Sequence, residues 1–297
     1  MLHEIAPGVA HLPIIFVNAY FVGQPDKPWF LVDSGVPGSA AKIRTAAAER
    51  YGPNAKPQCI VLTHGHFDHR GGALELAEQW DVPIYAHPLE LPYLTGKSGY
   101  PPPDPTIGGF IAFGSRFMPA SGHDLGGKIQ PLPDGDFLPD WEIIFTPGHA
   151  PGHISLFRRH DKTLLAGDAL ATANMDSFIG MITMKQELAR AGAPFNCDWN
   201  ATKNSVEKLA ALEPAIIACG HGTPMTGSDT TQKMREFAQR FSIPSHGRYV
   251  DEAAQTNETG VVALPPAPFD PLPGQMLGVA SVACTLWFLA RNRAGRE

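Results

Sequence analysis

The segment His64-Gly65-His66-Phe67-Asp68-His69 constrains this 297-residue chain more than any other feature of its sequence. It follows a short apolar run, Cys59–Leu62, which predicts a buried strand. Two histidines two positions apart on extended chain point the same way and can bind one ion together. Asp68 and His69 follow where the chain turns and can face a second ion. Imidazole and carboxylate ligands suit zinc first, and also iron, manganese or nickel.

Three further predicted strands end in loops that carry His or Asp beside glycine. Trp141–Phe145 leads into Thr146-Pro147-Gly148-His149, Thr163–Ala166 into Gly167-Asp168, and Ala215–Cys219 into Gly220-His221-Gly222. Glycines allow the backbone to approach a crowded site closely. Other strands are expected at 14–22, 29–32, 82–86 and 154–158, with helices at 39–51, 72–80, 203–212 and 230–241. This alternation indicates an α/β fold with its polar chemistry at strand ends.

The order of these motifs resembles the metallo-β-lactamase superfamily over about residues 5 to 245. The resemblance implies a four-layer αββα sandwich, of the α/β (α+β) class, with a dinuclear metal site at the loop ends of its two sheets. In this sequence His64, His66 and His149 would hold one ion, Asp68, His69 and His221 the other, and Asp168 would bridge them. The implied cofactors are two divalent ions, zinc first, with iron or manganese as alternatives. His153 falls outside the ligand pattern, and a supporting hydrogen bond is its expected role.

The implied reaction is hydrolysis of a small carbonyl ester such as a lactone or thioester. Two divalent ions outweigh the charges of Asp68 and Asp168, so a bridging water would ionise near pH 7. The resulting hydroxide would attack the carbonyl, and Asp68 would be the catalytic residue that carries the proton toward the leaving group. The chain contains no G-x-S-x-G motif of a serine hydrolase.

Departures from the family patterns reduce the number of candidate substrate classes. True β-lactamases of this superfamily carry Cys or Ser where Asp168 stands, so antibiotic hydrolysis is not expected. The stretch from Thr146 to His153 resembles glyoxalase II and the acyl-homoserine lactonases. Those lactonases commonly carry Tyr where this chain has Ala171, and the C-terminal region does not match the glutathione-binding region of glyoxalase II.

Two other functions remain open for this chain. A mononuclear iron sulfur (persulfide) dioxygenase of the same superfamily would use mainly His64, His149 and Asp168. A non-catalytic, membrane-associated accessory module would use the apolar C-terminal run as an anchor. Seven intact ligand positions argue against that second alternative.

A change in composition predicts a catalytic domain over residues 1–250 and a C-terminal extension over 251–297. The extension is Pro-rich at 264–273 and nearly all apolar at 276–290. We expect a short helix that docks on the body or on a second subunit in a homodimer; membrane contact is less favoured because spanning takes about 20 apolar residues. Within the domain, the Gly-, Pro- and aromatic-rich segment 88–134 predicts a lid or substrate loop, and His123 lies in it.

Composition also limits the partners. A formal net charge of −6 argues against nucleic acid. The four cysteines are scattered without a CxxC pair, which argues against a disulfide framework. The first residues lack the basic start and apolar run of a secretion signal. We therefore expect a cytoplasmic enzyme that acts on a small molecule.

Overall fold

The computed structural model describes residues 1–118, 120–133, 135 and 137–272. The chain divides into two compact units, Met1–Pro266 and Ala267–Glu297. The first unit therefore continues past residue 250, where the change in composition places a boundary. The apolar run expected to form a C-terminal helix at 276–290 lies outside the described residues.

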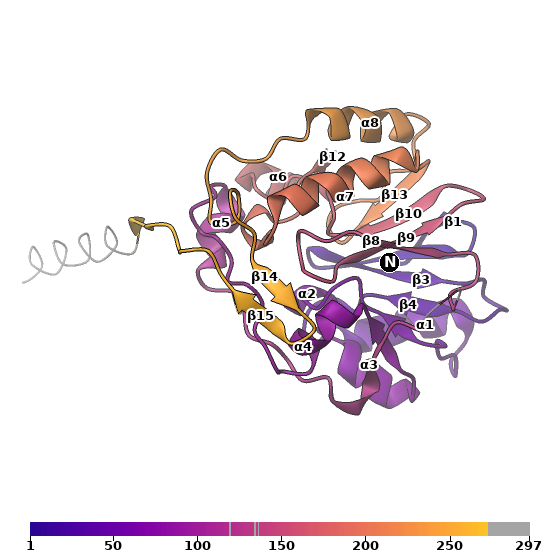
Figure 1. The fold of residues 1–297 in the computed structure, drawn as a ribbon. Helices are drawn as coiled ribbons and strands as arrows, with labels where there is room; N and C mark the ends of the chain where they lie inside the picture. Colours follow the sequence, from indigo (N-terminus) through magenta and orange to yellow (C-terminus); the bar gives the residue numbers. More distant parts are fainter. Residues whose placement is uncertain (119, 134, 136, 273–297) are drawn as a thin grey trace, which may run out of the picture. The chain divides into compact units, whose positions relative to one another are not determined.

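The larger sheet has seven strands in sequential order, and helices α1 (Ala40–Tyr51) and α3 (Ala73–Trp80) cover its outer face (Figure 1). The strands are β1 (His3–Ala6), β2 (Val9–Ile14), β3 (Val17–Val22), β4 (Phe30–Val32), β5 (Ile60–Val61), β6 (Ile84–Ala86) and β7 (Ile129–Pro131). Neighbours from β1 to β4 are antiparallel, and those from β4 to β7 are parallel. Ile43 of α1 and Leu76 of α3 pack on Ile60 in one buried cluster.

The second sheet has four strands in the order β13-β10-β9-β8, with α7 (Trp199–Ala211) and α8 (Thr230–Arg240) on its outer face (Figure 1). Its strands are β8 (Glu142–Phe145), β9 (Ile154–Arg158), β10 (Thr163–Gly167) and β13 (Ile216–Cys219). Successive side chains of a strand face opposite ways. Leu164 accordingly packs under the helices, while Leu165 packs against Val32 and Val61 between the sheets. The expected αββα sandwich is confirmed.

The remaining elements lie outside these two sheets and their four covering helices. They are α2 (Phe67–Arg70), η1 (Pro88–Glu90), α4 (Leu91–Leu94), α5 (Phe110–Ser115), η2 (Gly126–Lys128), β11 (Ala171–Ala173), α6 (Phe178–Thr183), β12 (Gln186–Ala189), η3 (Ala193–Phe195), β14 (Gln255–Asn257) and β15 (Gly260–Ala263). Hairpin β14–β15 belongs to the first unit, and its Val261 amide donates a hydrogen bond to Ser98 Oγ (3.2 Å).

One sequence prediction was wrong in its connectivity. The apolar stretch Ile14–Val22 predicts one strand, but it contains the end of β2, a turn and β3. Ile15 at the turn has φ 57° and is 81% exposed. Ile14 and Phe16, on either side of the turn, are both apolar, so no polar residue marks the turn and the periodicity could not locate it.

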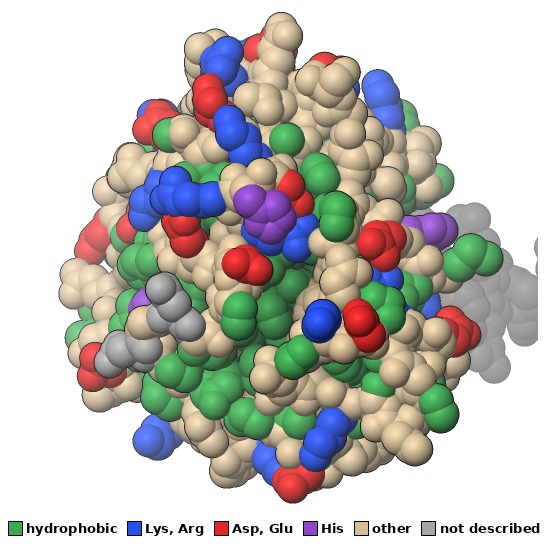
Figure 2. All heavy atoms as spheres, turned by 90° about the vertical axis from the view of Figure 1, so that its right-hand side faces the viewer, with side chains coloured by type: hydrophobic (Ala, Val, Ile, Leu, Met, Phe, Trp, Pro, Cys, Tyr) green, Lys and Arg blue, Asp and Glu red, His purple; other side chains and the backbone are tan. Residues whose placement is uncertain are grey.

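The surface is mixed in charge on the face that Figure 2 shows, where Lys and Arg side chains lie among Asp and Glu. Among the described residues, no helix has the combination of length and apolar character that crossing a bilayer requires.

Candidate metal centre

The predicted ligand residues come together at the ends of four strands, one in the larger sheet and three in the smaller. They follow β5, β8, β10 and β13, and form three overlapping groups whose ligand atoms lie within 4.8 Å of one another. All seven predicted positions take part, namely His64, His66, Asp68, His69, His149, Asp168 and His221. The site thus lies where loops of both sheets meet.

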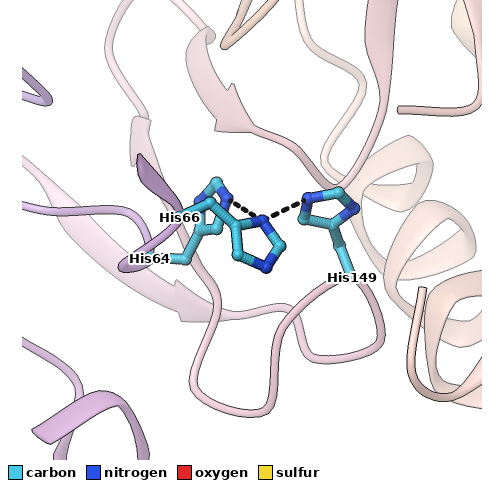
Figure 3. A group of neighbouring side chains, drawn as sticks. All are labelled: His64, His66 and His149. Carbon is cyan, nitrogen blue, oxygen red and sulfur yellow. Dashed lines mark hydrogen bonds between the residues drawn. The ribbon is translucent and has the colours of Figure 1, made fainter. Parts of the chain in front are cut away.

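His64, His66 and His149 form what we call the three-histidine group (Figure 3). His66 Nδ1 lies 3.0 Å from His64 Nε2 and 3.1 Å from His149 Nε2. A tetrahedral zinc ion with bonds of 2.0–2.1 Å would hold such nitrogens about 3.3 Å apart. Burial, followed by the neighbouring imidazoles, lowers the pKa of His64 and of His66, and burial lowers that of His149. These side chains are therefore neutral, with lone pairs available for an ion.

Asp68, His69 and His221 form the second set, which we call the aspartate-containing group. His221 Nε2 lies 3.5 Å from Asp68 Oδ2 and 3.1 Å from Asp168 Oδ2. The same Asp168 oxygen is 3.5 Å from His69 Nε2 and 3.5 Å from His149 Nε2. One carboxylate therefore contacts nitrogens of both groups.

The carboxylates dominate the electrostatics of the second group. Burial opposes a charge on His221, but Asp168 and then Asp68 outweigh it and raise its pKa to about 9. Burial likewise opposes a charge on His69, whose pKa Asp168 and Asp33 nevertheless hold well above its usual value. Burial would raise the pKa of Asp168, yet His221 and His69 hold it well below the ordinary range. A cation is thus strongly favoured beside Asp168.

The buried polar atoms fit divalent metal ions. Asp168 Oδ1 is buried and, within the described part of the chain, accepts no hydrogen bond. An unsatisfied buried carboxylate oxygen is costly unless a cation or donor compensates it. A Cβ at Gly220 would overlap this oxygen, so glycine is what lets the strand end pass so close.

Supporting residues orient the ligands. His221 Nδ1 donates to the carbonyl of Phe16 (2.8 Å), which directs its Nε2 toward the two aspartates. His153 Nε2 accepts from the backbone N–H of Asp168 (2.8 Å), in keeping with the hydrogen bond expected of it. Burial, followed by His149, lowers the pKa of His153 to about 3, so it stays a neutral acceptor.

Asp33 is a functional residue that the sequence interpretation missed. Its Oδ2 lies 2.8 Å from His69 Nδ1, and its Oδ1 accepts from the Thr63 amide at 2.8 Å. Such carboxylate–histidine pairs fix the orientation of a metal-ligating ring. The available signal was its position, because Asp33 directly follows a buried strand, as the predicted ligand loops do.

A pocket opens onto His66, Asp68, His149, Asp168 and His221. Its walls are mainly apolar and aromatic, formed by Phe16, Phe67, Tyr100, Pro101, Pro103, Ile111, Met118, Met175 and Phe195. Segment 88–134 thus contributes part of the wall, whereas its His123 is exposed and is not a lining residue. Among the described lining residues, Arg70 is the sole Lys or Arg, and its Nε donates to the Gly65 carbonyl (2.9 Å).

Comparison with known proteins gives the family. The model of the metallo-beta-lactamase superfamily matches residues 12–221, and the chain belongs to that superfamily. Among its relatives, the probable metallo-hydrolase YflN of Bacillus subtilis (strain 168) is 43% identical over 245 residues, which cover 80% of this chain and 93% of that protein. The hydroxyacylglutathione hydrolase of Erwinia tasmaniensis is 33% identical over 231 residues, covering 77% and 70% respectively.

Solved structures agree on the fold. The BLEG-1 B3 metallo-beta-lactamase is 25% identical, with a TM-score of 0.51 over 75% of this chain and 95% of that one. A B3 metallo-beta-lactamase with an active-site glutamic acid is 17% identical, with a TM-score of 0.55 over 80% and 87%. These two likenesses support the fold, whereas membership of the metallo-hydrolase superfamily rests on the family model and the relatives.

Proposed function

We propose that this protein uses two divalent ions to hydrolyse a small carbonyl ester, with a lactone or a thioester as the substrate class. The observation that carries the proposal is the position of Asp168, whose Oδ2 lies within 3.5 Å of nitrogens from both ligand groups. A carboxylate in that position suits a bridge between two ions. The relative named a hydroxyacylglutathione hydrolase supports an acyl substrate.

The bound ions, Asp68 and the aromatic walls of the pocket would have different roles in the reaction. Divalent ions bound there would lower the pKa of coordinated water to about 7 and polarise a carbonyl oxygen. Asp68 lines the pocket and lies next to His221, so its carboxylate is placed to take up a proton and pass it to the leaving group. Aromatic walls such as Phe67 and Phe195 would exclude bulk water once a substrate is bound, which would strengthen the electrostatic interactions inside.

The test combines metal analysis with a substrate panel. We expect close to two ions per chain in protein produced with ample zinc, and turnover of lactones or thioesters ahead of phosphodiesters and β-lactams. Metal-stripped protein is the control and should recover activity when zinc is returned. One iron per chain, with oxygen uptake on a persulfide, would instead identify the dioxygenase and contradict the proposal.

A further inference from the structure

One buried carboxylate contacts both loops that supply the three-histidine group. Glu90, at the end of η1, is 0% exposed and belongs to none of the ligand groups found among the described residues. Its Oε2 accepts from the backbone N–H of Gly65 (2.9 Å), and its Oε1 accepts from that of Gly152 (2.7 Å). Gly65 stands between His64 and His66, and Gly152 lies between His149 and His153.

These two loops come from different sheets. The first follows β5 in the larger sheet, and the second follows β8 in the smaller sheet. His66 Nδ1 and His149 Nε2, which lie 3.1 Å apart, therefore depend on a connection across the sheets. Glu90 provides one through two hydrogen bonds to a single rigid, planar group.

Packing leaves little freedom around this carboxylate. A Cβ at Gly152 would lie 2.8 Å from Glu90 Cγ, and a Cβ at Gly65 would overlap the Tyr100 hydroxyl. That hydroxyl donates to Glu90 Oε2, and the Tyr100 ring lies edge-on to His66 with 4.7 Å between centroids. Glu90 therefore holds a pocket-lining residue of segment 88–134 as well as the two loops.

We propose that Glu90 is a positioning residue that sets the spacing of the three-histidine group by holding Gly65 and Gly152 on one carboxylate. The inference rests on a metal ion in that group, as the proposed function does, but not on which ester is cleaved. The two can fail separately. Wild-type protein that binds no metal would defeat both. Wild-type protein that binds metal but cleaves neither lactones nor thioesters would defeat only the proposed function, and a Glu90 variant that binds metal like the wild type would defeat only this inference.

The primary test is Glu90→Gln in the full-length protein. Glutamine keeps one oxygen, but its NH2 group would face a backbone N–H, so one of the two loops loses its acceptor. We expect the affinity for the tightest-bound Zn²⁺ to fall about 10- to 100-fold, the range typical of residues that orient metal ligands. Competition with a chromophoric chelator measures it, and the visible spectrum of Co²⁺-loaded protein reports ligand geometry independently of activity.

Asp104→Asn is the matched control. Asp104 is also a buried carboxylate that accepts two backbone hydrogen bonds, from Thr106 (2.9 Å) and Arg248 (2.6 Å), but neither partner belongs to a histidine loop. It should lower thermal stability while leaving the Zn²⁺ affinity and the Co²⁺ spectrum unchanged. Equal loss of affinity in both variants, or none in Glu90→Gln, would overturn the assignment.

Glu90→Asp keeps the test decisive if Glu90→Gln does not fold. Aspartate retains both oxygens on a shorter side chain, so it cannot reach both amides at their present separation. We expect weaker Zn²⁺ binding together with faster hydrogen exchange at the Gly65 and Gly152 amides. Wild-type affinity in this variant would contradict the proposal.

Discussion

The three-histidine group and the aspartate-containing group face each other across Asp168, but they present different charges to an ion. Burial keeps His64, His66 and His149 neutral. In the other group, aspartates raise the pKa of His69 and His221, so these rings carry protons near neutral pH when no metal is bound. An ion entering the first group meets free lone pairs, whereas an ion entering the second must displace protons.

The two groups also differ in how they are held. Glu90 contacts the first group only through the backbone amides of its loops. Asp33 instead contacts a ligand ring directly, through His69 Nδ1. The first arrangement fixes the path of the chain, and the second fixes the orientation of one side chain and raises its basicity. Substitutions should therefore affect the two groups in separable ways.

The largest effect is expected from Asp168→Ala, because Asp168 Oδ2 lies within 3.5 Å of nitrogens of both groups. Substituting a residue that only orients metal ligands typically costs up to roughly 100-fold in activity, and turnover should fall by more than that in Asp168→Ala. The metal content should fall as well. Ester turnover and elemental analysis measure the two losses. Asp176→Ala is the control, since Asp176 accepts a hydrogen bond from the Ala193 amide and does not line the metal-site pocket. Retained turnover in Asp168→Ala would remove the bridging role.

The next largest effects are expected from substituting one ligand of each group, which tests whether the two groups bind their ions independently. His221→Ala should leave the three-histidine group intact and keep about one ion per chain. His149→Ala should weaken the three-histidine group, which we expect to bind its ion more tightly because no proton has to be displaced there. Both should lose roughly 100-fold or more in turnover, but only the second should lose its tightest ion. Stoichiometry after dialysis against a weak chelator distinguishes them. Loss of both ions from His221→Ala would show that the groups do not bind independently.

The sequence predicted the ligands better than their supports, and the reason is physical. His64, Asp168 and His221 each follow an apolar strand beside a glycine, so residue type and position agree. Asp33 also follows an apolar strand, but no glycine stands next to it, and Glu90 does not directly follow a strand. Their partners, His69 and two backbone amides, are brought to them only by the folded chain. An isolated acidic residue in a sequence is far more often solvated than buried.

Some elements of the fold could be predicted from the sequence, and others could not. Strands such as Ile154–Arg158 and the helix over 39–51 could be recognised because a run of apolar or helix-forming residues ends at clear turn residues. The turn at Ile15 could not, since the residues around it are apolar on both sides. The hairpin β14–β15 is short and partly exposed, and it is fixed by tertiary contacts such as that of Val261 with Ser98.

The charge difference between the groups predicts how the metal-free protein responds to pH. The pKa of His221 is raised from its ordinary 6.5 to about 9 in the folded state. A raised pKa contributes stability that is fully present below pH 6.5 and is lost as the pH rises toward 9. Unfolding by urea after chelation should therefore show a loss on the order of 2 kcal/mol between pH 6.5 and 9.

The control for this pH effect is His221→Ala, which should lose less stability over the same range. Zinc-loaded protein should also respond less, because the ion replaces the proton beside Asp168. Identical pH profiles for wild type and His221→Ala would show that this ring does not carry the proton.

The smallest expected effect lies outside both groups, at Arg70. Its guanidinium lines an otherwise mainly apolar pocket next to Gly65, and it is held through Nε at that residue's carbonyl. Burial lowers its pKa, yet arginine remains charged. A substrate that carries a carboxylate beside its ester would gain a charge-assisted contact there, which is typically worth about 1.5 kcal/mol or more.

Arg70→Gln should therefore raise KM for an anionic ester about tenfold, since 1.4 kcal/mol corresponds to a factor of ten. It should leave KM for an uncharged ester of the same length nearly unchanged. The pair of substrates is its own control, because damage to either metal group would lower turnover of both. Equal losses on the two esters would assign Arg70 to holding the Gly65 loop, and so to the three-histidine group instead of the substrate.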